Sequence, residues 1–322
     1  EALLLEQEVG RWDGLVAVVS AMSGVTNALL ACARAAAQAG EGETATRIHD
    51  LREKHLAALC GLELDQQAEL FEELEVHWNE LRKVCAAIRL EGEASWQRLD
   101  EAASLGERVN ARIFAAALRR QGVAARAVDA MQLVVTTPRQ ADGARPLQPQ
   151  TDEDIRAGLL PLLQAGIVPV VTGFIGSTLE GQITTLGRGA SDYTSTLVGA
   201  ALDAAEVWNW TDVPGVMTSD PRLVPDAHLI TTLTYDEMSW LSAFGARVLH
   251  PETVSPLAKR DIPLHVRNTF RPYTPGSRVQ GRGISLGGGG LGVACLPYRF
   301  GQTGSTGLAE WLRAGLLPAG WR

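Results

Sequence analysis

Lysine is scarce in this chain. Among 29 basic residues the only lysines are Lys54, Lys83 and Lys259, and the rest are arginines. A reaction that depends on a lysine side chain therefore has few candidates here. Basic residues are also outnumbered by acidic ones, which gives a net charge of -8. The chain has no overall basic excess of the kind nucleic-acid-binding proteins use, so we expect no nucleic-acid partner.

Several sequence motifs of enzyme classes are missing. The sequence contains no GxxxxGK[ST] loop and no HExxH, and the spacings GxSxG (283–287) and GxGxxG (287–292) occur only inside the glycine-rich tail, outside any expected strand-to-helix turn. None of the four cysteines forms a CxxC pair, and no His or Cys spacing suggests zinc, so we expect no protein-bound metal centre and reduced, buried thiols. Phosphate binding by a P-loop and hydrolysis by a serine or zinc centre therefore lack support.

Long apolar runs are absent as well. No stretch reaches the ~18 residues that a membrane-spanning helix needs, and no signal peptide is visible. We therefore expect a cytoplasmic protein with no membrane partner. The 46% hydrophobic and 20% charged content is typical of a globular domain, and the length allows a large core.

Strand-like and helix-like segments alternate along the chain. Apolar, β-branched runs predict strands at 14–20, 123–130, 132–137, 167–177, 205–211 and 262–268. Helical periodicity predicts helices at 25–40, in 43–90, and at 99–122, 151–166, 191–203 and 234–260, the last split near Pro251. Thr151 and Asp154 have the spacing of a helix-capping box. This alternation predicts a mainly parallel sheet covered by helices on both faces.

Three turns between strands and helices are rich in small hydroxyl residues and acids. They lie at residues 20–27, 187–192 and 211–222. Turns at the carboxyl ends of parallel strands share one edge of a sheet, and a helix N-terminus favours an anion. With Arg188 and Arg222 beside them, these turns suggest a site for an anionic ligand, although ordinary capping explains any one of them.

Two acidic residues do not suit an anion site. Asp192 follows the GRGAS turn directly, so it needs a cation to face. Glu107, in the helical segment SLGERVN, is either a solvated glutamate or the partner of an ammonium group on a substrate. A charge-assisted hydrogen bond of the latter kind contributes roughly 1.5–3 kcal/mol.

Five separated motifs resemble those of aspartate kinases, in the same order. They are VVSAMSGVTN, SLGERVNA, GFIGS with GQITTLGRGASDYTSTLVGAAL, WTDVPGVMTSDPR and FGARVLHPETVSPL. The resemblance covers residues 14–279; glutamate and uridylate kinases share the fold but not this set. It implies an α/β fold, a three-layer α/β/α sandwich around a mainly parallel sheet. It also implies phosphorylation of L-aspartate by ATP, which opens lysine, threonine and methionine synthesis.

The resemblance also implies roles for individual residues. Those on the side of L-aspartate and the transferred phosphoryl group are Ser20, Thr26, Glu107, Arg188, Ser191 and Asp192. Glu107 would take the α-ammonium group, Arg188 the substrate carboxylate, and Asp192 would organise Mg²⁺ at the phosphoryl group. Those expected to hold ATP are Thr211, Asp212, Met217, Arg222, Arg247 and Val248.

The chain also departs from the aspartate kinase pattern. The family's first strand and its KFGGTS-type lysine loop are absent, and none of the three lysines is expected to replace that lysine. Arg247 and Ala190 stand where the family has lysine and glycine. We therefore expect a catalytic domain at 1–279 that binds nucleotide weakly and turns over slowly or not at all. A non-catalytic regulatory subunit and a sister kinase with another carboxylate substrate remain alternatives.

Two further expectations concern the tail and the assembly. Residues 280–322 form a glycine-rich tail with no recognisable ACT domain. We interpret this tail as a flexible linker, or as a terminus translated in a shifted reading frame, rather than as a phosphate-binding loop. Helices on both faces of the sheet leave room for a homodimer.

Overall fold

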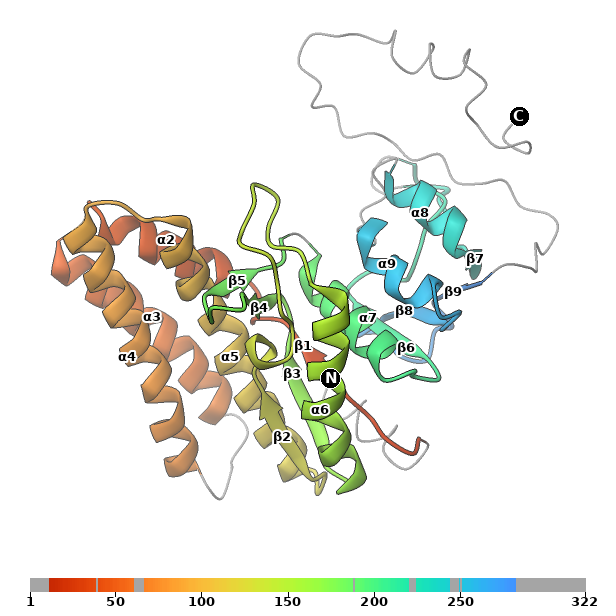
Figure 1. Cartoon of the computed structure of the whole chain (residues 1–322), viewed down its shortest axis with the longest axis horizontal. Coiled ribbons are helices and arrows are strands. Elements are labelled where there is room, and N and C mark those ends of the chain that lie inside the picture. The colour runs from red at the N-terminus through yellow and green to blue at the C-terminus, as the bar shows by residue number, and fades with distance from the viewer. Residues whose placement is uncertain are drawn as a thin grey trace, which may run out of the picture. The chain divides into compact units, whose positions relative to one another are not determined.

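The computed structural model of the chain describes residues 12–38, 40–60, 67–187, 189–219, 224–243, 249 and 251–281. These residues form two compact units (Figure 1). The first consists of the described residues up to Val207 together with Glu252–Ile262, and the second of those from Trp208 to Pro251 and from Pro263 onward. The expected tail lies outside the described residues from position 282.

A parallel sheet forms the centre of the first unit. Its strands are β1 (Ala17–Val19), β2 (Ala125–Val128) and β3 (Val168–Thr172), in the order β1-β3-β2. Val171 on the middle strand pairs with Val18 on one side and with Val128 on the other. β-branched residues in one row pack well on a pleated surface. The predicted strands at 14–20 and 123–130 are confirmed at their centres, and the one at 167–177 is confirmed in its first half.

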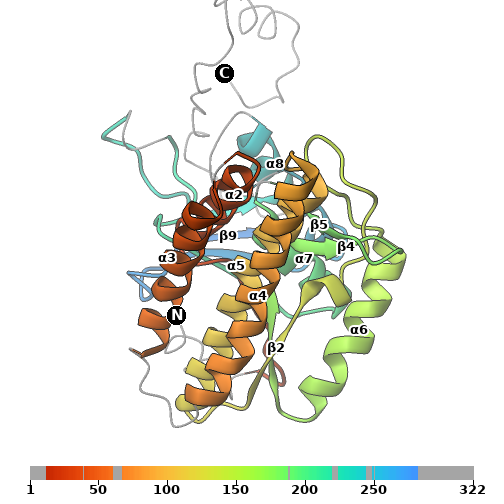
Figure 2. The ribbon, with the colours of Figure 1, turned by 90° about the vertical axis from the view of Figure 1, so that its left-hand side faces the viewer.

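Helices cover both faces of this sheet. Ala17, Val19 and Val170 pack on α5 (Trp96–Arg120). Val18 and Val171 point to the opposite face, where they meet α6 (Gln148–Gln164) and α7 (Ala190–Ala201). Two views show α5 and α6 on opposite sides of β2 (Figures 1 and 2). The first unit thus has the three predicted layers, α/β/α.

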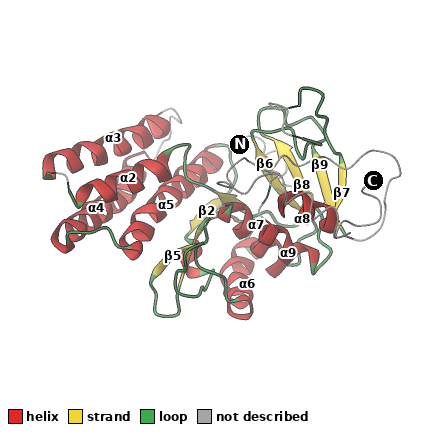
Figure 3. Ribbon diagram, turned by 90° about the horizontal axis from the view of Figure 1, so that it is seen from above, coloured by secondary structure: helices red, strands yellow, loops and turns green. Residues whose placement is uncertain are grey.

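Four helices pack together beside the sheet. They are α2 (Val25–Ala36), α3 (Glu41–Cys60), α4 (Gln67–Glu91) and α5, seen side by side in Figure 3. Their shared core includes the fully buried Trp78, Leu29 and Leu105. The predicted helices within 43–90 are therefore confirmed. None of the described helices is both long enough and apolar enough to cross a membrane.

The cysteines differ in burial. Cys32 on α2 and Cys85 on α4 are buried free thiols whose sulfurs lie 3.9 Å apart. Cys60, at the end of α3, is exposed. The prediction of buried thiols is therefore confirmed for the first pair and wrong for Cys60, because it is the neighbouring Leu59 on α3 that packs into the helical core. Cys295 lies outside the described residues.

The second unit is built on a mixed sheet. Its strands are β6 (Val207–Thr211), β7 (Thr232–Thr234), β8 (Leu264–Asn268) and β9 (Ser277–Gln280), in the order β6-β8-β9-β7. β9 runs parallel to β7 and antiparallel to β8. Helix α8 (Tyr235–Ala243) packs on β7 and β9. Helix α8 is separate from the next helix, α9 (Pro251–Ala258), which lies in the first unit from Glu252 on, so the predicted split near Pro251 is confirmed.

The run at 167–177 is not one strand. β3 ends at Thr172, and a second strand, β4 (Ile175–Ser177), pairs antiparallel with β5 (Ile183–Thr185). The break falls at Gly173 and Phe174, where Phe174 has φ = 68°. A non-glycine residue rarely adopts this left-handed conformation, so the surrounding structure holds the chain in a sharp turn here.

The predicted strand at 132–137 is also wrong. Residues 130–132 form the short 3₁₀ helix η1 (Ala130–Gln132), and Val135 makes only an isolated bridge to Ser177. Thr151 does not cap a helix, because α6 begins three residues earlier, at Gln148. Its hydroxyl instead donates to the Val135 carbonyl at 3.0 Å and accepts from the Val135 amide at 3.1 Å. Thr151 thus fixes the extended segment to α6.

Candidate active site

The turn that follows β1, residues 20–24, is held from two helices. Asn110 on α5 donates through Nδ2 to the Ser20 carbonyl at 2.6 Å. Lys54 on α3 donates through Nζ to the Ser23 carbonyl at 2.6 Å. Gly24 precedes α2 with φ = 78°, a conformation that glycine adopts without strain. This first turn therefore has a fixed backbone at the start of α2, whose first helical turn carries the half-buried Thr26.

Glu107 lies under the first turn and is only 1% exposed. Its Oε1 accepts a hydrogen bond from the Ala21 amide at 3.2 Å, while Oε2 is buried without a partner among the described residues. Burial raises the pKa of Glu107 to about 7, because the charged carboxylate loses its hydration and the hydrogen bond from the Ala21 amide does not make up for the loss. The reading of Glu107 as a solvated glutamate is therefore wrong.

The adjacent Gly106 explains how α5 comes so close to the first turn. A Cβ at this position would lie 2.8 Å from the Ala21 Cβ and within 3.3 Å of side-chain atoms of Leu29 and Val25. Real Cβ atoms do not approach other atoms that closely, so any side chain here would push the first turn away from α5. Glycine at 106 is thus what lets Glu107 reach the Ala21 amide.

Two more segments meet the first turn. Gly173 follows β3, and its amide donates to the Val19 carbonyl at 2.7 Å. A Cβ on Gly173 would lie 2.6 Å from both Cβ and Oγ of Ser191, in the first helical turn of α7. The Ser191 hydroxyl donates to the exposed Ser20 hydroxyl at 3.1 Å. The expectation that turns at the carboxyl ends of strands converge is met for these segments.

Asp192 follows Ser191 in the first turn of α7, which begins after Gly189 with φ = 68°. Its side chain is half-buried, and its carbonyl accepts from the Ser195 hydroxyl at 2.7 Å. An aspartate in a first helical turn is favoured by the helix dipole. Arg188, just before this helix, lies outside the described residues.

Three of the predicted nucleotide residues lie in the second unit. The Thr211 hydroxyl, at the end of β6, donates to the exposed Asp212 carboxylate at 3.2 Å. The Asp212 carbonyl accepts from Asn268 Nδ2 at 2.9 Å. Met217 is half-buried and forms an isolated bridge with Leu229. Arg222, Arg247 and Val248 lie outside the described residues, so their roles remain predictions.

Three residues at or near this site carry little signal in the sequence. Asn110 and Lys54 contact it from 90 and 31 residues away along the chain. Phe174, with its left-handed backbone, has no sequence signal beyond the glycine before it. The SLGERVN segment could have suggested Asn110, which lies three residues after Glu107 and therefore near it on the same helix face.

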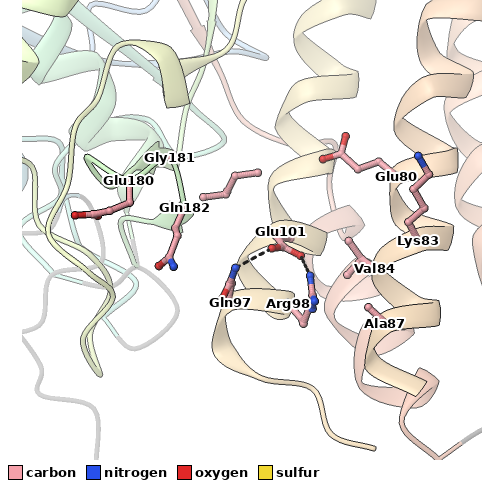
Figure 4. A pocket seen from close by; sticks show the side chains of 11 residues that line it. Glu80, Lys83, Val84, Ala87, Gln97, Arg98, Glu101, Glu180, Gly181 and Gln182 are labelled. Carbon is pink, nitrogen blue, oxygen red and sulfur yellow. Dashed lines mark hydrogen bonds and ion pairs between the residues drawn. The ribbon is translucent and has the colours of Figure 1, made fainter. Parts of the chain in front are cut away.

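Two hollows in the first unit lie away from these residues. One, of about 480 Å³, is bordered by α4, α5 and the β4–β5 turn (Figure 4). The other, of about 850 Å³, is bordered by α5, β2 and α6. None of the sequence-predicted site residues lines either hollow. The cluster of Ser20, Glu107 and Ser191 is therefore the stronger candidate for a ligand site. Glu107 Oε2 is buried without a partner among the described residues, and a bound ligand could supply the missing hydrogen bond.

The chemistry of this cluster suits a small zwitterionic molecule. The Glu107 carboxylate offers a buried negative charge for an ammonium group, and the Ser20 and Ser191 hydroxyls can bond to oxygens of a ligand. Among the described residues, no group of three or more His, Cys, Asp or Glu side chains is placed to hold a metal ion. A magnesium ion that arrives with a nucleotide needs only one or two protein carboxylates, since phosphates and waters complete its shell.

A family model and individual known proteins place this chain in the same family. A model of the Amino acid kinase family matches residues 4–268. Aspartokinase 1, chloroplastic, of Arabidopsis thaliana is 35% identical over 278 residues, which cover 82% of this chain and 46% of that protein. Lysine-sensitive aspartokinase 3 of Escherichia coli (strain K12) is 36% identical over 262 residues, covering 81% and 56%. The chain thus spans about half the length of the curated relatives it matches.

Solved structures agree. The crystal structure of E. coli aspartokinase III in complex with aspartate and ADP superposes with a TM-score of 0.80 at 34% identity, covering 88% of this chain and 62% of that one. Aspartate kinase from Clostridium acetobutylicum superposes with a TM-score of 0.69 at 25% identity, covering 89% and 62%. The residues matched by the family model include the three segments that meet around Ser20 and Glu107. Together with the α/β architecture, this match shows that the chain belongs to the amino acid kinase family.

Proposed function

We propose that this chain is the catalytic part of an aspartate kinase. It would transfer the γ-phosphoryl group of ATP to the side-chain carboxylate of L-aspartate and so give 4-phospho-L-aspartate. The relatives that support this proposal are named aspartokinases, and one of the similar structures contains aspartate and ADP. The reaction would open the synthesis of lysine through diaminopimelate, and of threonine and methionine.

The proposal rests on the buried carboxylate of Glu107. Its Oε2 is buried and has no partner among the described residues, while its Oε1 holds the Ala21 amide, next in the chain to the exposed Ser20 whose hydroxyl bonds to Ser191. The α-ammonium group of an amino acid supplies both the donors and the positive charge that this oxygen lacks. A charge-assisted hydrogen bond of this kind contributes roughly 1.5–3 kcal/mol.

The surrounding residues would orient the rest of the substrate. We assign Arg188 to a substrate carboxylate, since a guanidinium binds carboxylates through two parallel hydrogen bonds. Ser191 supports it, and Thr26 borders the amino acid from α2. Ser20 lies on the path of the phosphoryl group. The first turn, α2 and α7 place Ser20, Thr26 and Ser191, while Arg188 lies outside the described residues.

The chemical step needs little covalent help from the protein. The substrate carboxylate is already ionised at pH 7, so no strong general base is required. One of its oxygens forms the bond to the γ-phosphorus while the bond from that phosphorus to the bridging oxygen breaks and ADP leaves. Catalysis then consists of positioning and of neutralising charge.

For the nucleotide side we propose one role for Asp192 in the first unit and, separately, a set of nucleotide-binding residues numbered above 210. Asp192 would organise the magnesium ion that arrives with ATP, which neutralises developing charge on the phosphates when bound. The residues proposed to hold ATP are Thr211, Asp212, Met217, Arg222, Arg247 and Val248. The Thr211 hydroxyl and Asp212 carboxylate stand at the end of β6, the usual place for ligand contacts in α/β proteins.

A coupled assay for ADP release tests the function. The 322-residue chain is mixed with ATP, magnesium and either L-aspartate or L-glutamate, and aspartate binding is measured separately by calorimetry. We expect slow ADP release with aspartate and none with glutamate. Aspartate binding without turnover would favour a non-catalytic regulatory role instead, and preference for glutamate a sister kinase. Absence of both binding and turnover would refute the proposal.

A further inference from the structure

A buried polar cluster ties α5 to the end of β5. Asp100 on α5 is 2% exposed and forms an ion pair with Arg139. The Thr185 hydroxyl, also buried, donates to Asp100 Oδ1 at 2.8 Å and accepts from Arg139 Nη1 at 2.6 Å. We call Asp100, Arg139 and Thr185 the anchor cluster. Its three members come from a helix, a loop and a strand, so it fixes three elements at one point.

The loop that carries Arg139 presses on the backbone just after β5. Within this loop, residues 137–146, the Thr137 amide donates to the Arg145 carbonyl at 2.8 Å. The Ala144 amide donates to the Thr185 carbonyl at 2.8 Å. A Cβ on Gly143 would lie 2.7 Å from the Gly187 nitrogen, so the two backbones touch. The position of Gly187 therefore depends on where the anchor cluster holds this loop.

Helix α5 sets the distance between this point and the first turn. Asp100 and Glu107 are seven residues apart, which is nearly two full turns, so both lie on one side of the helix. At 1.5 Å per residue their Cα atoms are separated by roughly 10 Å along the axis. Glu107 holds the Ala21 amide, and Asp100 holds Thr185. One rigid element thus carries the supports of two separate site segments.

The neighbouring charged residue on α5, Glu101, does not hold a site segment. Glu101, the next residue, accepts from Arg98 at 2.9 Å and from Gln97 at 3.3 Å on the wall of the 480 Å³ hollow (Figure 4). Arg139 also stacks on Trp96, with its guanidinium carbon 4.6 Å from the centroid of the ring. Removing either charge of a buried ion pair leaves the other charge buried without a partner. We therefore expect the anchor cluster to tolerate little change in either Asp100 or Arg139.

We propose that Asp100, Arg139 and Thr185 are positioning residues that hold the backbone at Gly187 at a set distance from the first turn. They control aspartate binding through this backbone without touching the substrate. The inference rests on the proposed function, because it takes the segment between Gly187 and α7 to carry the carboxylate contact.

Hydrogen–deuterium exchange of the 322-residue chain tests the positioning directly. We compare wild type with Asp100→Asn, with Thr185→Val and with Thr185→Ser, which keeps the hydroxyl. The control is Asp129→Asn, which weakens a comparably buried pair, Arg112–Asp129 at 2.8 Å, outside the loop. We expect peptides spanning 186–192 to exchange roughly tenfold faster in the first two variants and normally in the last two. Unchanged exchange in Thr185→Val, the mildest disruption, would overturn the proposal.

Substrate measurements separate this inference from the proposed function. In Asp100→Asn and Thr185→Val we expect the aspartate KM or Kd to rise roughly tenfold, with the ATP KM within about twofold and full recovery in Thr185→Ser. Faster exchange with unchanged aspartate affinity would overturn the positioning role. If wild type neither binds nor phosphorylates aspartate, the proposed function fails, and the exchange result alone then decides whether the anchor cluster holds the loop.

Discussion

Replacement of Glu107 by glutamine has opposite effects on stability and on ligand affinity. Burial raises the pKa of Glu107 from 4.5 to about 7 in the folded chain. Between these values the folded chain keeps a proton that the unfolded chain releases, so the free energy of unfolding falls as pH rises. At 1.36 kcal/mol per pKa unit the penalty totals about 3 kcal/mol and is fully present above pH 7.

Glu107→Gln removes this penalty because an amide does not ionise. At pH 4 the carboxyl group is mostly protonated in both the folded and the unfolded chain, so wild type and variant should be similarly stable without ligand. At pH 8 the variant should be more stable by about 2 to 3 kcal/mol, a shift in melting temperature of roughly 5 °C. Thermal unfolding at the two pH values measures the difference. Equal stability of both proteins at pH 8 would refute the claim that burial controls this carboxyl group.

Aspartate binding should change in the other direction. Loss of a charge-assisted bond of roughly 1.5–3 kcal/mol weakens affinity about 10- to 150-fold. Binding to wild type at pH 7 should also release protons, because the ammonium group favours the ionised carboxylate; calorimetry in buffers of different ionisation enthalpy detects this. The control is Glu101→Gln, the same change on the outer side of α5. If Glu107→Gln binds aspartate as tightly as this control, Glu107 does not meet the ammonium group.

The remaining predictions concern packing and the first turn. Gly106→Ala should destabilise the chain by about 1–3 kcal/mol and weaken aspartate binding, because its Cβ would collide with Ala21. Gly42→Ala, a helical glycine with open space around its Cβ, should instead stabilise by up to about 1 kcal/mol, and melting curves compare the two. Leu29→Ala should cost about 2–5 kcal/mol in urea unfolding, since Leu29 is fully buried; a smaller loss would mean that the core refills the cavity. Asn110→Ala should raise the aspartate KM by freeing the Ser20 carbonyl, and an unchanged KM would exclude Asn110 from holding the first turn.

Sequence patterns predicted those parts of the fold that depend on local signals. The apolar runs around Val18 and Val171 gave buried parallel strands, and long periodicity gave the four packed helices. Small residues after Val19 and before α7 correctly marked turns that converge. These features follow from residues close together in the chain, where hydrophobic periodicity and glycine placement act.

The features that the sequence did not predict depend on distant partners. Val135 and its neighbours have strand-like composition, but tertiary contacts with Thr151 and Ser177 override that propensity. The break at Phe174 divides an apolar run that looks continuous. Glu107 was singled out as a candidate, but its burial and its bond to Ala21 arise from contacts 86 residues apart, which no local pattern contains.

Because α5 carries Asp100 and Glu107 almost two turns apart, the stretch between them should be sensitive to length in a way that its individual side chains are not. Deleting one residue there would rotate one end of the helix by about 100° relative to the other and draw it in by about 1.5 Å. One of the two carboxylates would then face away from its loop, even if every remaining residue were ideal for a helix. Divergence of this segment is therefore expected to occur by substitution on its outward side, while insertions and deletions collect in the loops.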